Sequence, residues 1–374
     1  MYIPMMKTRQ EELRVSRELN YCFSDEIIPL FEILNEIYEK KYEIDDNGNR
    51  LMELKPGGKK KTPILKEKTS DDIITLDFIN DIVNKSKVFI DYFRFDINKY
   101  GKQVDISKVT LAYTLNNNSD EYIKKLQSIS NYQNMIPVLS LKKIFILPKA
   151  KTIEVIKQLQ SLNLAIAFRI EDGLYEIYKD IIENNLRESD YLLYDIGEQN
   201  FCSKIMELDE LQECNTKAKK IVLNSPRHLK NANKDYEDCC VTNLIDNAAA
   251  NEYVDYDLDG FGDYGGLKDQ LPDKNAGSNG KGAALALMYN YKDNSFYSFC
   301  NSDTNQGQKG YLKVIKDILK YEYILNPDGN CEAYRKIKSM FAKHKNGSWR
   351  IWNNIGLTRY IHQAYLKTKD KKES

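Results

Sequence analysis

The chain has 374 residues, 42% of them hydrophobic, and its 55 Lys and Arg residues balance its 55 Asp and Glu residues. This length and composition suffice for a large folded core of one or two domains. The balanced charge excludes recruitment of nucleic acid or an anionic membrane by a global field, so any such partner must use a local patch.

Cysteine usage and apolar runs bear on the location of the protein. The seven cysteines are scattered, odd in number and without a CxxC pair, which argues against a disulfide framework and a zinc site. The start, MYIPMMKTRQEEL, lacks the basic and apolar stretches of a secretion signal, and no apolar run approaches the ~18 residues that span a bilayer. We therefore expect reduced thiols in a soluble, cytoplasmic protein.

Eight short apolar runs alternate with longer stretches of helical periodicity, which is typical of parallel βα units. The runs cover residues 2–7, 27–33, 88–93, 135–141, 165–170, 191–196, 221–226 and 259–264. Helices are expected at 10–19, 70–84, 119–129, 152–162, 174–185 and 203–213, and less clearly at 242–257. Eight units predict an α/β fold, a closed (β/α)8 TIM-type barrel over residues 1–265. An open doubly wound sheet is the alternative, although no glycine-rich phosphate loop follows the first strand.

Two parts of the sequence depart from this alternation. Residues 39–70 carry turn dipeptides and charge, including KPGGKKKT, and predict a basic loop or hairpin that projects from a barrel end. A solvated loop is the default interpretation of its lysines, with nucleic acid or protein contact as the alternative. Residues 284–291 and 295–302 form a candidate hairpin and helices follow to residue 367, so we expect a C-terminal α+β extension over 266–374 that packs on the barrel.

Charged or polar residues stand at the C-terminal ends of the predicted strands. In a barrel these ends converge on one face, where active sites are built. Asp263, flanked by glycines in DGFGDYGG, is therefore expected to join a ring of ionisable groups. Buried salt bridges with a purely structural role are the alternative. The residues concerned are Lys7, Arg9, Glu32, Asp91, Arg94, Ser140, Arg169, Glu171, Asp195, Glu198, Ser225 and Asp263.

This ring suggests two kinds of chemistry. Clustered carboxylates suit Mg²⁺ or Mn²⁺, which prefer hard oxygen ligands. Proton transfer between carboxylates of unlike pKa is the alternative. The predicted metal ligands are Glu32, Asp91, Asp195 and Asp263; Lys7 and Arg169 complete the predicted catalytic set and hold an anionic group of the substrate. The predicted substrate-binding residues are Arg9, Arg94, Glu171, Glu198 and His228.

The order of several short motifs resembles the phage beta protein family over nearly the full length of the chain. The motifs are YIPMMKTRQEEL, IIPLFEI, VFIDYF, IAFRIED, LLYDIG, GDYGG and SWRIWNNIG. The resemblance implies a role at phage defence or exclusion loci, where a beta protein acts beside a toxic partner and restrains it. The family pattern carries over onto Lys7, Arg9, Glu32, Asp91, Arg169, Asp195 and Asp263.

Two functional hypotheses follow. The first is a defence protein whose barrel serves as a scaffold to sense or restrain a protein partner, either a toxin or a phage component. The second is a metal-dependent hydrolase or phosphodiesterase that acts on a nucleotide or nucleic acid at the carboxyl face of the barrel. Whether the chain is an enzyme is left open, because fold does not decide function.

Overall fold

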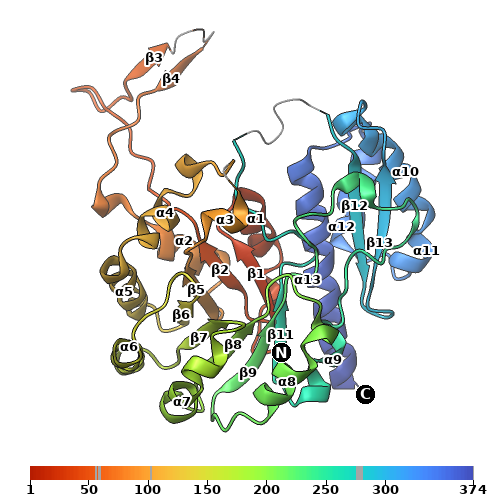
Figure 1. Cartoon of the computed structure of the whole chain (residues 1–374). Coiled ribbons are helices and arrows are strands. Elements are labelled where there is room, and N and C mark those ends of the chain that lie inside the picture. Colours follow the sequence, from red (N-terminus) through yellow and green to blue (C-terminus); the bar gives the residue numbers. More distant parts are fainter. Residues whose placement is uncertain (55–56, 58–59, 102, 275–280, 374) are drawn as a thin grey trace.

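The protein is built around a closed barrel of eight parallel strands (Figure 1). The computed structural model describes residues 1–54, 57, 60–101, 103–274 and 281–373. Around the barrel the strand order is β1-β11-β9-β8-β7-β6-β5-β2, with every neighbouring pair parallel. The strands are β1 (Tyr2–Lys7), β2 (Leu30–Ile33), β5 (Val88–Tyr92), β6 (Met135–Leu141), β7 (Ala167–Glu171), β8 (Tyr191–Asp195), β9 (Lys219–Leu223) and β11 (Gly260–Asp263). The predicted barrel fold is confirmed.

Helices surround the strands, as the periodicity predicted. They include α1 (Gln10–Glu18), α2 (Thr75–Ile82), α5 (Ser119–Ser128), α6 (Lys149–Leu162), α7 (Tyr175–Asn185) and α8 (Ile205–Gln212). Two short helices in the third connection, α3 (Ile97–Tyr100) and α4 (Thr110–Asn116), were not expected. The weak pattern at 242–257 corresponds to the single turn of α9 (Ala249–Glu252) and a following 3-10 turn.

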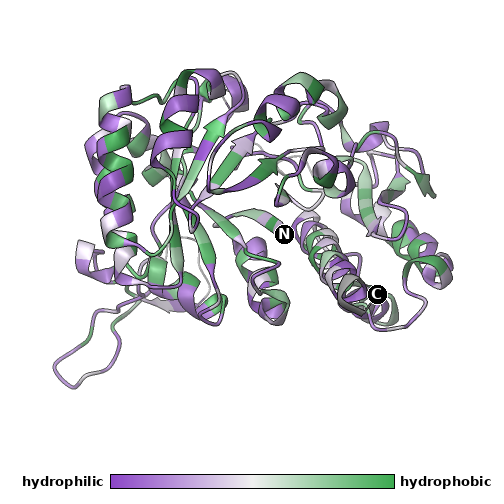
Figure 2. Ribbon diagram, turned by 90° about the horizontal axis from the view of Figure 1, so that it is seen from below, coloured by the Kyte–Doolittle hydropathy of each residue, from purple (hydrophilic) through white to green (hydrophobic). Residues whose placement is uncertain are grey.

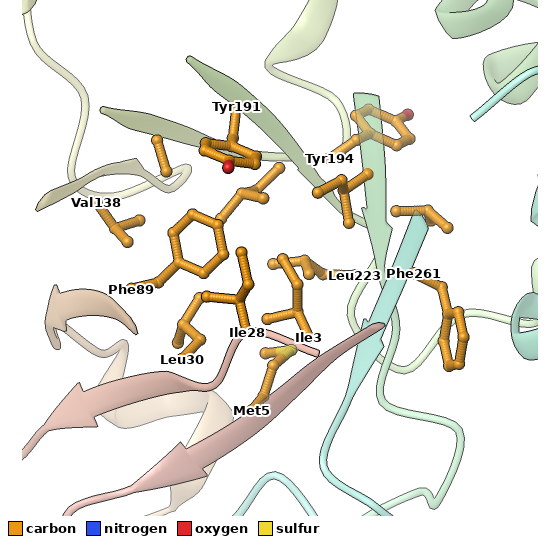
Figure 3. Packing of buried hydrophobic residues seen from close by; sticks show 14 of the residues in the cluster. Ile3, Met5, Ile28, Leu30, Phe89, Val138, Tyr191, Tyr194, Leu223 and Phe261 are labelled. Carbon is orange, nitrogen blue, oxygen red and sulfur yellow. The ribbon is translucent and has the colours of Figure 1, made fainter. Parts of the chain in front are cut away.

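The interior of the barrel is filled by apolar side chains from alternate strand positions. Ile3, Leu30, Phe89 and Leu223 converge there and are fully buried, whereas Phe261 points away from them (Figure 3). The ribbons of the strands are largely hydrophobic (Figure 2), as expected when helices cover the outside of a parallel sheet. The inner positions switch from apolar to charged near the carboxyl ends of the strands.

The C-terminal region forms a small sheet with helices beside the barrel (Figure 1). The predicted hairpin is present as antiparallel β12 (Ala284–Asn290) and β13 (Ser295–Asn301), and β13 also pairs with β10 (Cys240–Val241). Four helices follow: α10 (Tyr311–Lys320), α11 (Glu322–Leu325), α12 (Glu332–Ala342) and α13 (Trp349–Glu373).

The long helix α13 lies between this sheet and the barrel (Figures 1 and 2). Leu357 and Tyr360 of α13 belong to the same hydrophobic cluster as the barrel strands, while Trp352 and Ile355 pack into the core of the small sheet. A polar contact reinforces the packing on α1, where Asn354 Nδ2 donates to Glu11 Oε2 at 3.0 Å. The helix therefore joins the two regions.

The insertion between β2 and β5 projects from the barrel as a separate arm (Figures 1 and 2). Its outer part is a two-stranded antiparallel ribbon of β3 (Met52–Leu54) and β4 (Lys61–Pro63). Of the predicted basic motif, Lys55 and Lys59 lie outside the described residues. In the described part of the chain, no helix is long and apolar enough to cross a membrane.

Replacing Gly262 with Ala should destabilise the barrel. A Cβ on Gly262 would lie 2.6 Å from Leu223 Cδ2 and 2.9 Å from the Ile3 carbonyl oxygen. Overpacking of this kind costs about 1–3 kcal/mol, measurable by denaturant unfolding. Gly356→Ala in α13 is the control, because its Cβ would meet only the Leu287 carbonyl oxygen at 3.5 Å. Equal stability of Gly262→Ala and the wild type would contradict the register of β1, β11 and β9.

Candidate functional site at the carboxyl end of the barrel

Strand register gathers charged side chains inside the carboxyl end of the barrel. Residues paired between parallel neighbours project to the same face of a sheet. Lys7 on β1 pairs with Glu32 on β2, which pairs with Asp91 on β5. All three are completely buried. Since positions two residues earlier on these strands fill the apolar interior, these side chains form the next layer of the barrel.

Arg169 of β7 stands at the centre of this layer. Its Nη1 donates to Glu32 Oε1 and to Asp91 Oδ2, each at 2.8 Å. Its Nε and Nη2 donate to Asp195 Oδ2 at 2.9 and 2.6 Å. Lys7 Nζ donates to Glu32 Oε2 at 2.7 Å. The structure thus brings together five of the six residues of the predicted catalytic set.

Four further residues complete this cluster, and sequence reasoning missed them all. Asp269, which follows β11, accepts hydrogen bonds from Lys7 Nζ at 2.6 Å, Lys99 Nζ at 2.8 Å and the Tyr100 hydroxyl at 2.9 Å. The Tyr264 hydroxyl donates to Glu32 Oε1 at 2.9 Å. Asp269, Lys99 and Tyr100 belong to connections, where no strand end signals a position at the site. The barrel-end network, as used below, comprises Lys7, Glu32, Asp91, Lys99, Tyr100, Arg169, Asp195, Tyr264 and Asp269.

In the barrel-end network, three cations offset most of the charge of four acids: Lys7, Lys99 and Arg169 face Glu32, Asp91, Asp195 and Asp269. Burial opposes ionisation of Glu32, yet the positive charges of Lys7 and Arg169 lower its pKa to about 2. Burial likewise opposes ionisation of Asp269, but Lys7 and Lys99 bring its pKa well below the ordinary value. Glu32 and Asp269 are therefore held as carboxylates, which is the condition for a stable buried ion cluster.

Two charged side chains near this network, Asp91 and Lys142, have pKa values that are shifted against ionisation. Burial raises the pKa of Asp91 despite the nearby charge of Arg169, and in the described part of the chain its Oδ1 has no hydrogen-bond partner. Lys142, half-buried just after β6, has its pKa lowered to about 8 by burial and by the charge of Arg169. Its Nζ donates to the Arg94 carbonyl oxygen at 2.7 Å. Both shifts have the same main cause, because burial disfavours the charged form of a carboxylate and of an ammonium group alike.

Asp263 lies outside the barrel-end network, and the position expected for it is wrong. The register pairs Gly262 with Ile3, whose side chain points into the barrel (Figure 3), so the next residue points outward. There the carboxylate accepts hydrogen bonds from the hydroxyls of Tyr2 at 3.0 Å and Tyr360 at 2.6 Å. Asp263 therefore fastens α13 to the barrel wall.

A cavity of about 170 Å³ lies next to this contact, on the outer side of β1 and β11. Aromatic rings of Tyr2, Phe261, Tyr289 and Tyr360 line it, with Glu26 also on its wall. None of its lining residues belongs to the barrel-end network. It is therefore separate from the charged end of the barrel.

The predicted substrate-binding residues are mostly engaged elsewhere. Arg9 pairs with Glu12 at 2.6 Å, and Arg94 lies over the ring of Tyr122 with its Nη2 donating to the Ser140 carbonyl oxygen at 2.7 Å.

The acidic members of that group also have local partners. Glu171 accepts from the Lys143 backbone N–H at 2.7 Å. Glu198 lies 3.6 Å from His228 Nδ1. None of these contacts joins the barrel-end network, so a substrate role for these residues stays a prediction.

The geometry does not fit the predicted Mg²⁺ or Mn²⁺ site. Arg169 occupies the space between the carboxylates of Glu32, Asp91 and Asp195, and Asp263 is on the other side of the sheet. Among the described residues, the one group of three potential ligand atoms within 4.8 Å of one another is Asp238, Cys239 and Asp317. There Lys313 pairs with both carboxylates. The residues at the barrel end therefore form salt bridges where the sequence had suggested metal ligands.

Replacing Arg169 with Met should cost about 3–5 kcal/mol of unfolding free energy at pH 7, because it removes the cation shared by the buried carboxylates of Glu32 and Asp91 and the partly exposed carboxylate of Asp195. The loss should shrink as the pH falls toward 4, because protonation then removes the repulsion. The stability of the wild type should instead decrease as the pH falls. Its Glu32 has a pKa of about 2, so its contribution is complete above the unfolded value and disappears as the pH falls toward 2.

Denaturant unfolding at several pH values measures this difference. Arg14→Met is the control, since Arg14 is largely exposed and pairs only with Glu18 at the surface of α1. It should change stability by less than about 1 kcal/mol at every pH. Equal effects of the two substitutions would show that the barrel-end network does not stabilise the fold.

Asp263 should give the protein a second, opposite pH dependence. Burial raises its pKa to about 6, although hydrogen bonds from Tyr360, Gly265 and Tyr2 oppose this. Between pH 4 and 6 the folded protein thus binds more protons than the unfolded chain, so stability falls as the pH rises. Relative to Asp263→Asn, the wild type should lose on the order of 3 kcal/mol across this window. A difference that is constant from pH 4 to 7 would contradict the burial of this carboxyl group.

Comparison with known proteins finds one family. The sequence matches the Beta protein family over residues 2–365, and no curated protein matches it. Two solved structures are similar at 10% identity: the Bacillus cereus spore cortex-lytic enzyme SleL and a family 123 glycoside hydrolase from Clostridium perfringens. The first match covers 97% of this chain and 74% of SleL with a TM-score of 0.34, and the second covers 100% and 69% with a TM-score of 0.30.

Neither structural similarity bears on function, because both TM-scores are low. The family match is the stronger evidence of relationship, because it extends over nearly the whole chain and agrees with the motif order noted in the sequence. This chain belongs to the Beta protein family.

Proposed function

We propose that the protein acts in phage–host conflict as a binding protein, which docks a toxin or a phage component on the projecting arm. The projecting arm is the segment of residues 39–70 that carries the β3–β4 ribbon. Membership in the Beta protein family supports the biological setting. The observation that carries the binding role is the exposed apolar surface of this arm.

The described residues of the projecting arm leave large apolar side chains in contact with solvent. Ile44 is 62% exposed and Leu54 is 59% exposed, and Leu51, Met52 and Leu65 are also exposed. A soluble surface seldom presents such a group together unless it meets another surface. These five side chains belong to no core cluster of the protein.

A two-stranded ribbon gains little stability by itself in water. The described ribbon pairs only within itself, so its outer edges offer unpaired backbone groups. Strand edges of this kind are a recurrent docking surface for an extended segment of another protein. Binding of a partner would cover both the apolar side chains and one of these edges.

An ion pair and hydrogen bonds hold the two ends of the projecting arm together at its base. Lys41 Nζ lies 2.5 Å from Asp72 Oδ1, and the same carboxylate accepts from the backbone N–H and hydroxyl of Thr69. The backbone of Glu39 donates to the Asp72 carbonyl oxygen at 2.8 Å. These contacts close the arm at its root and hold its outer part away from the barrel.

The charge of the projecting arm favours an acidic partner surface. Nine Lys and Arg residues stand against six Asp and Glu residues between positions 39 and 70, whereas the whole chain is neutral. An excess of positive charge speeds association with an acidic surface, and the apolar residues supply the affinity. A protein is favoured over nucleic acid because the exposed side chains are aliphatic and do not offer bases a stacking platform.

A metal-dependent hydrolase or phosphodiesterase is the second candidate function. The unpartnered Asp91 Oδ1 and the lowered pKa of Lys142 favour chemistry at the barrel end. What weighs against a metal mechanism is the pairing of Glu32, Asp91 and Asp195 with Arg169. The binding role is therefore the stronger proposal.

Polar substitution of the ribbon should abolish protection against phage. Met52→Ser combined with Leu54→Ser removes two exposed side chains of the ribbon without touching the core. A loss of about 1.4 kcal/mol of binding free energy lowers the affinity for a partner tenfold. We therefore expect at least a ~10-fold loss of protection at an unchanged melting temperature. The measurement is plating efficiency of phage on cells that carry the gene with its neighbours.

The control is Leu164→Ser, at a site 77% exposed in the connection from α6 to β7; it should protect like the wild type. If Lys60→Gln with Lys61→Gln abolishes protection while the ribbon variant retains it, the partner is nucleic acid. If the ribbon variant protects and a folded Asp91→Asn or Asp195→Asn does not, the hydrolase function holds and the binding proposal fails.

A further inference from the structure

A cysteine, an arginine and a histidine meet at the junction of α12 and α13, far from both the projecting arm and the barrel-end network. Cys331 is the N-cap residue of α12, and its carbonyl oxygen accepts from the Arg335 N–H at 3.1 Å. From α13, Arg359 Nη1 donates to Cys331 Sγ at 3.3 Å, and His362 is near enough to lower the pKa of this thiol. Arg359 and His362 are three residues apart and so lie on one face of α13.

Arg359 is a buried cation with an unused donor. The residue is 1% exposed, and its Nε donates to the Tyr289 carbonyl oxygen of β12 at 2.8 Å. Within the described part of the chain, its Nη2 and the Nδ1 of His362 have no hydrogen-bond partner. Among the described residues, no ion pair joins this guanidinium to a carboxylate, so the thiol is the group positioned to supply negative charge. A buried charge without a counter-ion is costly.

We propose that Cys331 is a thiolate nucleophile that hydrogen peroxide oxidises to a sulfenic acid, and that Arg359 and His362 hold the thiolate and the added oxygen. Three features that lower a thiol pKa act together here: a helix N-terminus, an arginine and a histidine. Burial opposes ionisation, yet the hydrogen bond from His362 and the charge of Arg359 lower the pKa of Cys331 to about 7.

The reaction needs no group beyond these residues and peroxide. The Arg359 guanidinium holds the sulfur as the thiolate. The sulfur attacks one oxygen of hydrogen peroxide, so that an S–O bond forms while the O–O bond breaks. The leaving hydroxide takes up the proton that the thiol had released and departs as water, and sulfur is oxidised by two electrons as the peroxide is reduced. The new oxygen provides the acceptor that Arg359 Nη2 lacks.

The site lies just beneath the surface. Cys331 is 4% exposed, but the turn immediately before it, residues 327–330, is exposed, and His362 is partly exposed. The Cys331 N–H donates to Asn326 Oδ1 at 3.0 Å, which anchors the end of this turn. Hydrogen peroxide is little larger than water, so a small displacement of the turn admits it.

Other cysteines of the chain provide an internal comparison. Cys22 and Cys300 are buried like Cys331, but burial raises their pKa values to about 12 and about 11. The charged or titratable groups that face Cys331 are Arg359 and His362 from α13 and Tyr334 from its own helix. Of these, the two on α13 distinguish it from the other buried thiols.

Thiol reactivity in the intact native chain tests the proposal. Iodoacetamide labelling from pH 5 to 10, read for each cysteine by mass spectrometry, should give Cys331 a midpoint near 7. Brief treatment with hydrogen peroxide followed by dimedone should label Cys331 at least ~10-fold faster than Cys300. Arg359→Met and His362→Gln should each raise the midpoint and slow oxidation. Arg335→Met is the control, because this exposed arginine of α12 pairs with Glu332 and not with the thiol.

Two results would overturn the proposal. One is a Cys331 midpoint at or above 9 in the wild type, which needs no variant to fold. The other is peroxide labelling of Cys331 no faster than that of Cys300, even if iodoacetamide reacts with it. An upward shift of the Cys331 midpoint in Arg359→Met, together with an unchanged Cys331 midpoint in Arg335→Met, supports it.

Discussion

One guanidinium, that of Arg169, holds together acids from three other strands across the carboxyl end of the barrel. Carboxylates buried at this depth are tolerated only when cations and hydrogen bonds accompany them. Arg169 supplies this for Glu32, Asp91 and Asp195, while Lys7 links the same layer to Asp269 in the loop after β11. The end of the barrel is thus closed by its own charges, and the structural interpretation of the polar strand ends accounts for most of their contacts.

The barrel was predictable because its signals are local. Each strand is a short, mostly buried run, and most of the runs carry a charged or polar residue at or near the carboxyl end. Asp263 shows where such reasoning fails. The strand Gly260–Asp263 offers Phe261 as its one large apolar side chain, and Phe261 packs outward against Tyr2, so the apolar pattern does not reveal which face is inside. Only pairing with β1 decides that Asp263 faces α13.

Three residues of the barrel-end network could not be predicted from the strand pattern, because they belong to the connections between strands. Asp269 is far in the chain from Lys99 and Tyr100, and it meets them only when the loop after β11 and the short helix α3 close over the same end. Tyr264 is different: it follows Asp263 and therefore has the opposite direction, so a correct register would have predicted its contact with Glu32. Strand alternation can be read from sequence, whereas loop closure depends on tertiary packing.

Three features occupy separate parts of the molecule. The barrel and its charged end form the frame, the projecting arm presents exposed apolar and basic side chains, and Cys331 lies where α12 meets α13. This division agrees with the general observation that variable connections on a rigid barrel carry specific functions.

A crystal structure determined in the presence of Mn²⁺, with anomalous scattering data, tests the central claim most directly. The account predicts Arg169 in contact with the carboxylates of Glu32, Asp91 and Asp195 and no anomalous peak among them. A manganese ion bound by these acids, with Arg169 displaced, would contradict it and restore the metal-dependent enzyme.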